Sequence, residues 1–253
     1  GVVANAMAGL LRWTAGLPDA AVVSMERALD LADELRHPYS QAFALHHATL
    51  LDVWRSDAPS VAARAEESRR LADTHDYAIW RALALVFSGV ARVASGDREE
   101  GLVELEEGFT LYEQLATPPI FWPALLAIRA TTLGAAGEFE RGLEVIDEAW
   151  ASLTDDHPAL ADVAIAHGDL HLLMPGGDGS VAEAHFERAA ALSAERGARM
   201  IELQALTRLA TVRAGGPAEN ETCHRLRSLF ETFTEGFATP QLRAAAVLMT
   251  GQR

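Results

Sequence analysis

Turn-forming residues recur about every 40 residues along this chain, and this spacing limits the folds open to it. They are Gly16, Ser56-Asp57, Gly96, Gly137, Gly176-Gly177 and Gly215-Gly216. Small residues stand seven or eight positions before most of these turns: Gly9, Thr49, Gly89, Ala130 and Gly168. A fixed period of 20 to 50 residues is typical of helical repeat proteins. We expect each small residue to let two helices of a pair approach closely.

The stretch from Asp76 to Leu115 shows the repeating unit most clearly. Trp80 to Ala94 carries apolar residues on most of its circumference, which is too many for a one-sided surface helix. After the break at Gly96, apolar residues recur at helical spacing. Asp97 and Glu100 have the spacing of a capping box, as do Ser180 and Glu183. The pattern predicts two antiparallel helices that need neighbours on both sides to bury their apolar faces.

The expected fold is therefore all-α, a helical-repeat solenoid in the form of a right-handed superhelix of about six helix pairs. Nothing in the sequence alternates with the period of a strand. We expect one domain over residues 1–253. Its predicted pairs are 1–35, 38–75, 77–115, 119–153, 158–197 and 198–235, followed by a closing helix at 240–250.

Two sets of residues resemble known families. The small-residue pattern of tetratricopeptide repeats is matched by Gly16…Ala20…Ala28, Gly96…Gly101 and Gly137…Gly142…Ala149. The segments Ala182–Leu192, Glu202–Ala210 and Phe233–Leu242 resemble the end of the long-helix repeat region at the C-terminus of bacterial adenylate/guanylate cyclase-type or AAA-ATPase signalling proteins. Leu35–Ala44 and Tyr77–Trp80 resemble earlier repeats of that region, although His46 and His47 replace aromatic residues there.

This resemblance implies a regulatory or sensor tail of a larger signalling protein. The motifs of the cyclase and ATPase domains are absent from the sequence, so neither activity is carried over. Gly1 in place of Met suggests a segment of a longer chain.

Composition excludes several functional classes. A net charge of -15 argues against a nucleic-acid surface, because phosphate contacts need clustered cations. All 21 basic side chains are arginine, which excludes a phosphate loop of the GK[ST] type and a Schiff-base lysine. The single Cys223 excludes an internal disulfide and favours a reducing cytoplasm. No apolar run reaches the length of a membrane span, and no secretory signal is present.

Candidate chemistry is sparse, and the sequence predicts no enzyme and no cofactor. His167 and His171 share a helix face and could hold a divalent metal, but no HExxH motif accompanies them. We interpret them as inter-helix or surface histidines and His185 as a helix-face residue. No GxSxG elbow appears.

The first helix of each pair lines the concave groove in tetratricopeptide-like stacks, which makes its aromatic and basic residues the candidate ligand-binding set. These are Trp13, His46, Trp54, Trp80, Arg81, Trp122 and Arg129. We expect a protein or peptide segment as the ligand, including the chain's own upstream ATPase or cyclase domains. Further arginines on these helices (Arg12, Arg55, Arg92, Arg208 and Arg213) would favour an acidic ligand.

Two alternatives concern the groove and the N-terminal face. A small-molecule inducer receptor would enclose a pocket lined by Trp80, Trp122 and Arg129. An exposed apolar face at Val2, Val3 and Leu10 would favour pairing with another surface, including a second copy of the chain.

Overall fold

The computed structural model describes residues 1–115 and 122–250, and within these ranges the protein is all-α, with thirteen helices and no strand. The helices are α1 (Val2–Thr14), α2 (Pro18–Leu35), α3 (Pro38–Trp54), α4 (Ala58–His75), α5 (Ala78–Ala94), α6 (Arg98–Glu113), α7 (Trp122–Ala136), α8 (Phe139–Ala151), α9 (Leu160–Leu173), α10 (Gly179–Arg196), α11 (Arg199–Val212), α12 (Glu219–Phe230) and α13 (Pro240–Thr250). The all-α prediction is confirmed. The start of the predicted 119–153 pair lies partly outside the described residues.

Contacts divide the chain into two compact units, which are described separately. Unit 1 holds helices α1 to α6 apart from Thr14, the last residue of α1, and unit 2 holds helices α7 to α13 together with Thr14–Leu17. The single continuous solenoid over residues 1–253 therefore stays a prediction.

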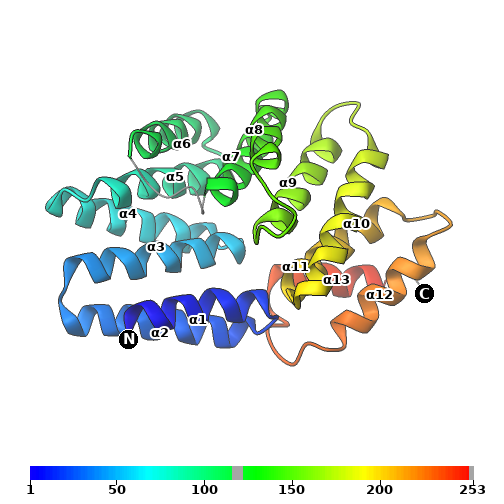
Figure 1. Ribbon diagram of the computed structural model, residues 1–253, viewed down its shortest axis with the longest axis horizontal. Coiled ribbons are helices and arrows are strands. Elements are labelled where there is room, and N and C mark those ends of the chain that lie inside the picture. Colours follow the sequence, from blue (N-terminus) through cyan, green and yellow to red (C-terminus); the bar gives the residue numbers. More distant parts are fainter. Residues whose placement is uncertain (116–121, 251–253) are drawn as a thin grey trace. The chain divides into compact units, whose positions relative to one another are not determined.

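In unit 1, consecutive helices from α2 to α6 pack on one another in chain order, and α3 also packs on α5 (Figure 1). Helix α5 thus touches α3, α4 and α6. Its buried residues lie around most of its circumference, from Trp80 through Phe87 to Val93. This confirms that Trp80 to Ala94 is too apolar for a one-sided surface helix.

Glycines allow the close approach of α5 and α6. A Cβ atom added at Gly89 would lie 2.5 Å from the carbonyl oxygen of Gly101 and 2.7 Å from the backbone nitrogen of Leu105. One added at Gly108 would lie 2.7 Å from the carbonyl oxygen of Ala82. These distances are shorter than non-bonded contacts allow, so the two backbones meet where no side chain fits. The predicted role of Gly89 is confirmed.

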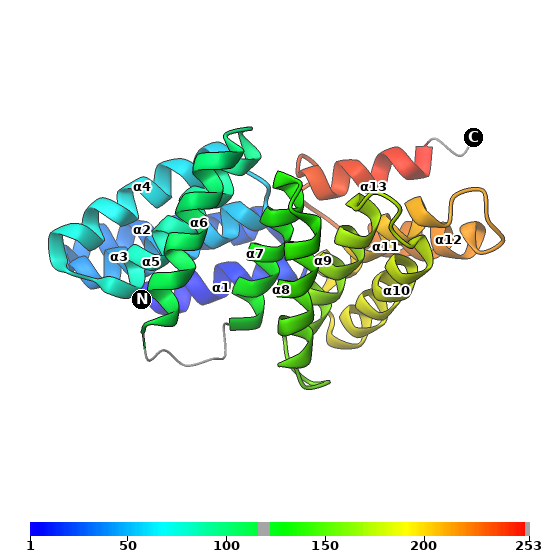
Figure 2. The same cartoon turned by 90° about the horizontal axis from the view of Figure 1, so that it is seen from above.

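In unit 2, α9 packs against α7, α8, α10 and α11, and α11 packs against α10, α12 and α13 (Figure 2). Ion pairs join these helices across the chain. The Arg213 guanidinium, with a side chain 16% exposed, lies 2.8 Å from Glu183 and 2.9 Å from Glu187. Arg225 donates to Glu187 at 2.7 Å, so α10 is connected to both the end of α11 and α12.

The predicted turns lie between helices, and their backbone conformation explains the residues found there. Gly16, Gly96 and Gly137 have φ of 84°, 96° and 95°, a left-handed region in which a Cβ atom would be strained. Ser56 reaches φ 58° at the same place in its turn, although it is not glycine.

Both predicted capping boxes are wrong. Asp97 precedes α6 but makes no side-chain capping bond, because its carboxylate accepts from Arg92 at 2.5 Å instead. The cap of α10 is Asp178, which accepts from the backbone N–H of Ser180 at 2.8 Å. Because α10 is capped by Asp178 and not by Ser180, Glu183 is too far along the helix to bond the cap, and it pairs with Arg213. At Asp97, a charge-assisted bond to arginine replaces local capping.

The predicted apolar N-terminal face is only partly exposed. Val3 is 56% exposed, but Val2 is buried in a cluster with Ala32 and Ala44. Among the described helices, none is both long enough and apolar enough to cross a membrane.

Candidate functional site

The structure brings two of the predicted groove residues into contact. The rings of His46 on α3 and Trp80 on α5 have centroids 5.3 Å apart. Trp13 is buried in α1, and Trp54 is half-buried at the end of α3. Arg81 is exposed, and its guanidinium lies 3.4 Å from the carboxylate of Asp73 on α4.

Trp122 and Arg129 lie on α7 of unit 2, and both are half-buried.

His46 and Trp80 belong to a group of rings that we call the α3–α5 aromatic cluster. Its members are Tyr39, Phe43, His46 and His47 of α3, Trp80 and Phe87 of α5, and Tyr77, which immediately precedes α5.

Helical spacing explains how α3 presents these rings. Tyr39, Phe43 and His46 stand at i, i+4 and i+7, so they share one face of the helix. Edge-to-face contacts connect Trp80 to Tyr39 at 5.6 Å and to Phe43 at 6.1 Å between centroids. Such contacts add to the stability that burial alone provides. The cluster therefore holds α3 and α5 together while reaching the surface at Tyr39, which is 46% exposed.

Two polar atoms inside this cluster have no hydrogen-bond partner among the residues that the structure describes. They are Nε1 of Trp80, whose residue is 6% exposed, and Nδ1 of His46. A buried polar group left without a partner costs about 1–3 kcal/mol. Desolvation holds the pKa of His46 well below its ordinary value, and the neighbouring His47 lowers it further. The imidazole of His46 is accordingly neutral at physiological pH.

His47 differs from His46 although it is adjacent in sequence. Its Nδ1 lies 2.7 Å from the carbonyl oxygen of Phe43, to which it donates, and its ring stacks on Phe43 at 4.1 Å. Burial lowers the pKa of His47, while the bond to Phe43 raises it. His47 thus packs in the cluster with its Nδ1 hydrogen-bonded. The polar atoms of the cluster that lack a hydrogen bond are those of His46 and Trp80.

Sequence reasoning missed Tyr39, Phe43 and Tyr77 as members of the site. The signal was present, since Tyr39 and Phe43 are four residues apart on one predicted helix. Residue type alone points to tryptophan and arginine. These three residues come close to Trp80 only because α3 packs on α5.

The arginines expected to make a groove basic are mostly paired with carboxylates. Arg92 reaches Asp97 and Glu104, and Arg55 reaches Asp52 at 2.9 Å. In unit 2, Arg208 binds Asp169 at 2.7 Å, and Arg213 binds two glutamates. Their charge is largely neutralised locally, so the structure lends no support to an acidic ligand.

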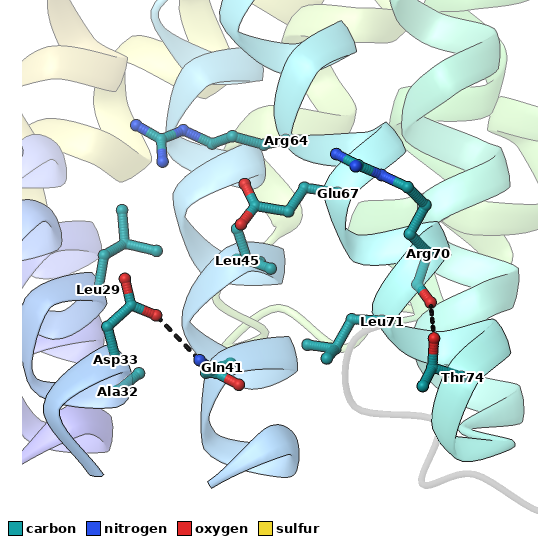
Figure 3. Close-up of a pocket in the computed structure, with 10 residues that line it drawn as sticks. All are labelled: Leu29, Ala32, Asp33, Gln41, Leu45, Arg64, Glu67, Arg70, Leu71 and Thr74. Carbon is teal, nitrogen blue, oxygen red and sulfur yellow. Dashed lines mark hydrogen bonds between the residues drawn. The ribbon is translucent and has the colours of Figure 1, made fainter. Parts of the chain in front are cut away.

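A separate pocket of about 420 Å³ lies between α2 and α4, over α3 (Figure 3). Leu29, Ala32, Leu45 and Leu71 supply its apolar wall. Asp33, Gln41, Arg64, Glu67, Arg70 and Thr74 supply its polar lining. Several of these polar groups already have partners: Gln41 donates to Asp33 at 3.0 Å, and Arg64 donates to Asp52 at 2.8 Å. None of the predicted groove residues lines this pocket.

Comparison with known proteins shows a likeness to a distant relative. No family model matches the chain. An uncharacterised protein of Rhizobium meliloti (strain 1021) is 28% identical over 140 residues. That stretch is 54% of this chain but 13% of the relative, so the matched part is a small portion of a much longer protein.

No group of three or more histidine, cysteine, aspartate or glutamate residues in the described part of the chain is arranged to hold a metal ion.

Proposed function

We propose that the protein is a non-catalytic scaffold that binds a protein or peptide segment at the α3–α5 aromatic cluster of unit 1. The observation that carries this proposal is the pair of unpartnered polar atoms, Nε1 of Trp80 and Nδ1 of His46. Both lie among rings that reach the surface at Tyr39. A ligand that supplies a hydrogen-bond acceptor to the indole N–H would remove a penalty that the free protein carries.

The chemistry of the cluster favours a peptide with an apolar anchor and an accessible backbone carbonyl. Aromatic side chains dominate the energetics of many protein interfaces because they bury a large area and lose little entropy. Tyr39 and Phe43 offer such an area, and Trp80 offers a donor next to it. An incoming apolar side chain that displaces the Tyr39 ring would bring its own carbonyl group toward the Trp80 N–H.

Within the proposal, the chain acts as the regulatory tail of a larger bacterial signalling ATPase or cyclase. The resemblance of Phe233–Leu242 and the other repeat segments supports this placement. The long relative also supports it, because the matched stretch is part of a much larger protein. The proposed superhelix of paired helices would present the first helices, including α3 and α5, on its concave side.

The test uses peptides selected from a phage-displayed library of random dodecapeptides, followed by calorimetric titration of the synthetic peptides. Trp80→Phe keeps an aromatic ring but removes the indole N–H, so we expect the Kd to rise about tenfold, the worth of one hydrogen bond to a buried donor. Trp150→Phe makes the same change on α8 of unit 2, outside the predicted ligand-binding set, and should leave the Kd unchanged. Equal affinity of the Trp80→Phe variant and the wild type would contradict the proposal.

The second candidate function is a small-molecule receptor, favoured by the pocket between α2 and α4. Its volume of about 420 Å³ falls within the range of ligand sites. We expect a ligand from a metabolite thermal-shift screen to lose its stabilising effect in Leu71→Trp, which fills the pocket, and to keep it in Trp80→Phe. The reverse pattern would favour the aromatic cluster.

A further inference from the structure

Unit 2 contains a histidine cluster that the sequence analysis did not assemble. His167 of α9 lies between two partners: its Nδ1 is 2.5 Å from Nε2 of His185 on α10, and its Nε2 is 3.0 Å from Oδ1 of Asp147 on α8. His171 is also near, with ring centroids 5.1 Å from His167 and 6.5 Å from His185. His185 therefore lies on the face of α10 that meets α9.

The bonding of this cluster fixes how many protons it can hold. Asp147 accepts from the Nε2–H of His167, which leaves the Nδ1 of a neutral His167 free to accept from the Nε2–H of His185. The pair can take up one extra proton and keep this bond, because only one of the two facing nitrogens, Nδ1 of His167 and Nε2 of His185, then carries a hydrogen. A second proton places hydrogens on both facing nitrogens, so their bond is lost and two imidazolium rings meet with centroids 4.1 Å apart.

The surroundings do not offset a second positive charge. The other ionisable groups facing the pair are Asp147 of α8, His171 of α9, Arg188 of α10 and Asp178 of the loop before α10. Arg188 lies 5.0 Å from the Trp150 ring and adds positive charge beside His185, and its guanidinium is also 2.9 Å from the exposed carboxylate of Asp155. Asp147 is the carboxylate bonded to the pair, and its side chain is 70% exposed.

We propose that His167 and His185 form a proton-sensitive latch between α9 and α10, closed at neutral pH and released when both imidazoles become protonated. The latch is independent of peptide binding at the α3–α5 aromatic cluster. It would allow acidification to loosen the contact between α9 and α10 while leaving the rest of the chain folded.

The folded chain favours the neutral form of His185, and this decides whether stability rises or falls with pH. Burial is the largest cause that lowers the pKa of His185, to about 4, and the neighbouring histidines add to it. A histidine whose pKa is lower in the folded state stabilises the fold above the unfolded value of about 6.5, and this contribution is lost as the pH falls from there toward 4. Asp162 of α9 acts in the opposite direction, because burial raises its pKa to about 6.

The experiment is hydrogen exchange of the whole chain followed by mass spectrometry at pH 7.5 and 5.0, corrected for the intrinsic pH dependence of exchange. In the wild type, the opening constant of amides in α9 and α10 should rise about threefold at pH 5.0, because a rise of about 30-fold from His185 is opposed by a fall of about tenfold from Asp162. His185→Gln removes the titrating ring, so the rise should disappear or turn into a fall. His224→Gln changes an exposed histidine on α12 and should keep the wild-type response. In Asp162→Asn, which lacks the opposing group, the rise should be larger.

Imidazole titration by nuclear magnetic resonance keeps the test decisive if His185→Gln folds poorly. We expect His185 of the wild type to take up its proton well below pH 6.5. Titration of His185 at or above 6.5, or a full pH response in a folded His185→Gln variant, would overturn the latch. Stabilisation by stoichiometric zinc that requires both His167 and His185 would overturn it too, because the rings would then face a metal and not each other.

Discussion

At the scale of single residues, His46 carries an energetic cost that pH should reveal. Its imidazole is desolvated, its Nδ1 has no partner, and its pKa is well below the ordinary value. Stability supplied by the neutral ring is present above about pH 6.5 and is lost as the pH falls below it, since the unfolded chain then binds the proton more readily.

We therefore expect His46→Phe to reduce the pH dependence of unfolding. Phenylalanine keeps ring contacts with Trp80 and Phe87 but has no proton to bind. Urea unfolding at pH 7.5 and 5.5 should show that the wild type loses about 1 kcal/mol more than the variant between these pH values. His75→Phe, at an exposed position at the end of α4, is the control and should behave as the wild type. An equal loss in His46→Phe and the wild type would contradict this account of His46.

The site was predictable from sequence only in part, for a reason visible at this scale. His46 and Trp80 were both chosen as aromatic residues on predicted first helices, and they do meet. Arg81 is a candidate as a basic residue of the same predicted helix as Trp80, but consecutive residues of a helix point about 100° apart, and it pairs with Asp73. Which rotation each helix adopts against its neighbours is set by packing, and residue type alone does not reveal it.

At the scale of helices, the close contact between α5 and α6 depends on residues without a side chain. Gly89→Ala would place a methyl group 2.5 Å from the Gly101 carbonyl oxygen, which is backbone and cannot turn aside. We expect the free energy of unfolding to fall by about 2–3 kcal/mol, measured by urea denaturation. Gly179→Ala, in open space at the first position of α10, should be neutral or stabilising by up to about 1 kcal/mol. An unchanged stability in Gly89→Ala would show that α5 and α6 lie further apart.

The ion pairs of Arg213 connect three helices, and their loss should cost more than that of a surface pair. Arg213→Met leaves the carboxylates of Glu183 and Glu187 without this cation and removes the bond from Arg213 to Thr222. We expect a loss of about 1–3 kcal/mol in urea unfolding. Arg69→Met removes a more exposed pair with Glu66 and should cost less than about 1 kcal/mol. Equal costs would mean that partial burial adds nothing to the Arg213 network.

Helix positions were predictable because the turn signals are local. A residue with φ near +90° is recognisable as glycine in the sequence, and the small residues before each turn mark where two helices touch. Caps were less predictable: the carboxylate of Asp97 binds Arg92, five residues earlier, and α10 is capped by Asp178, so that Glu183 binds Arg213 instead. Local signals therefore predict the helices, while the bonds at their ends depend on which side chains the fold brings within reach.

At the scale of the whole molecule, the functional proposal depends on helix pairs that are covered mainly by their neighbours. Unit 1 shows this arrangement internally, since α5 packs on α3, α4 and α6. The sequence predicts that the same repeat continues through unit 2 as one open superhelix. A concave binding face requires that continuity.

Small-angle X-ray scattering of the monomer, with the mass of 27.2 kDa confirmed by light scattering, tests this claim most directly. A compact domain of 253 residues has a radius of gyration of about 18 Å. An open stack of helix pairs predicts a value clearly above this and a pair-distance distribution with a long tail. A value near 18 Å with a symmetric distribution would contradict the repeat scaffold and the binding face derived from it.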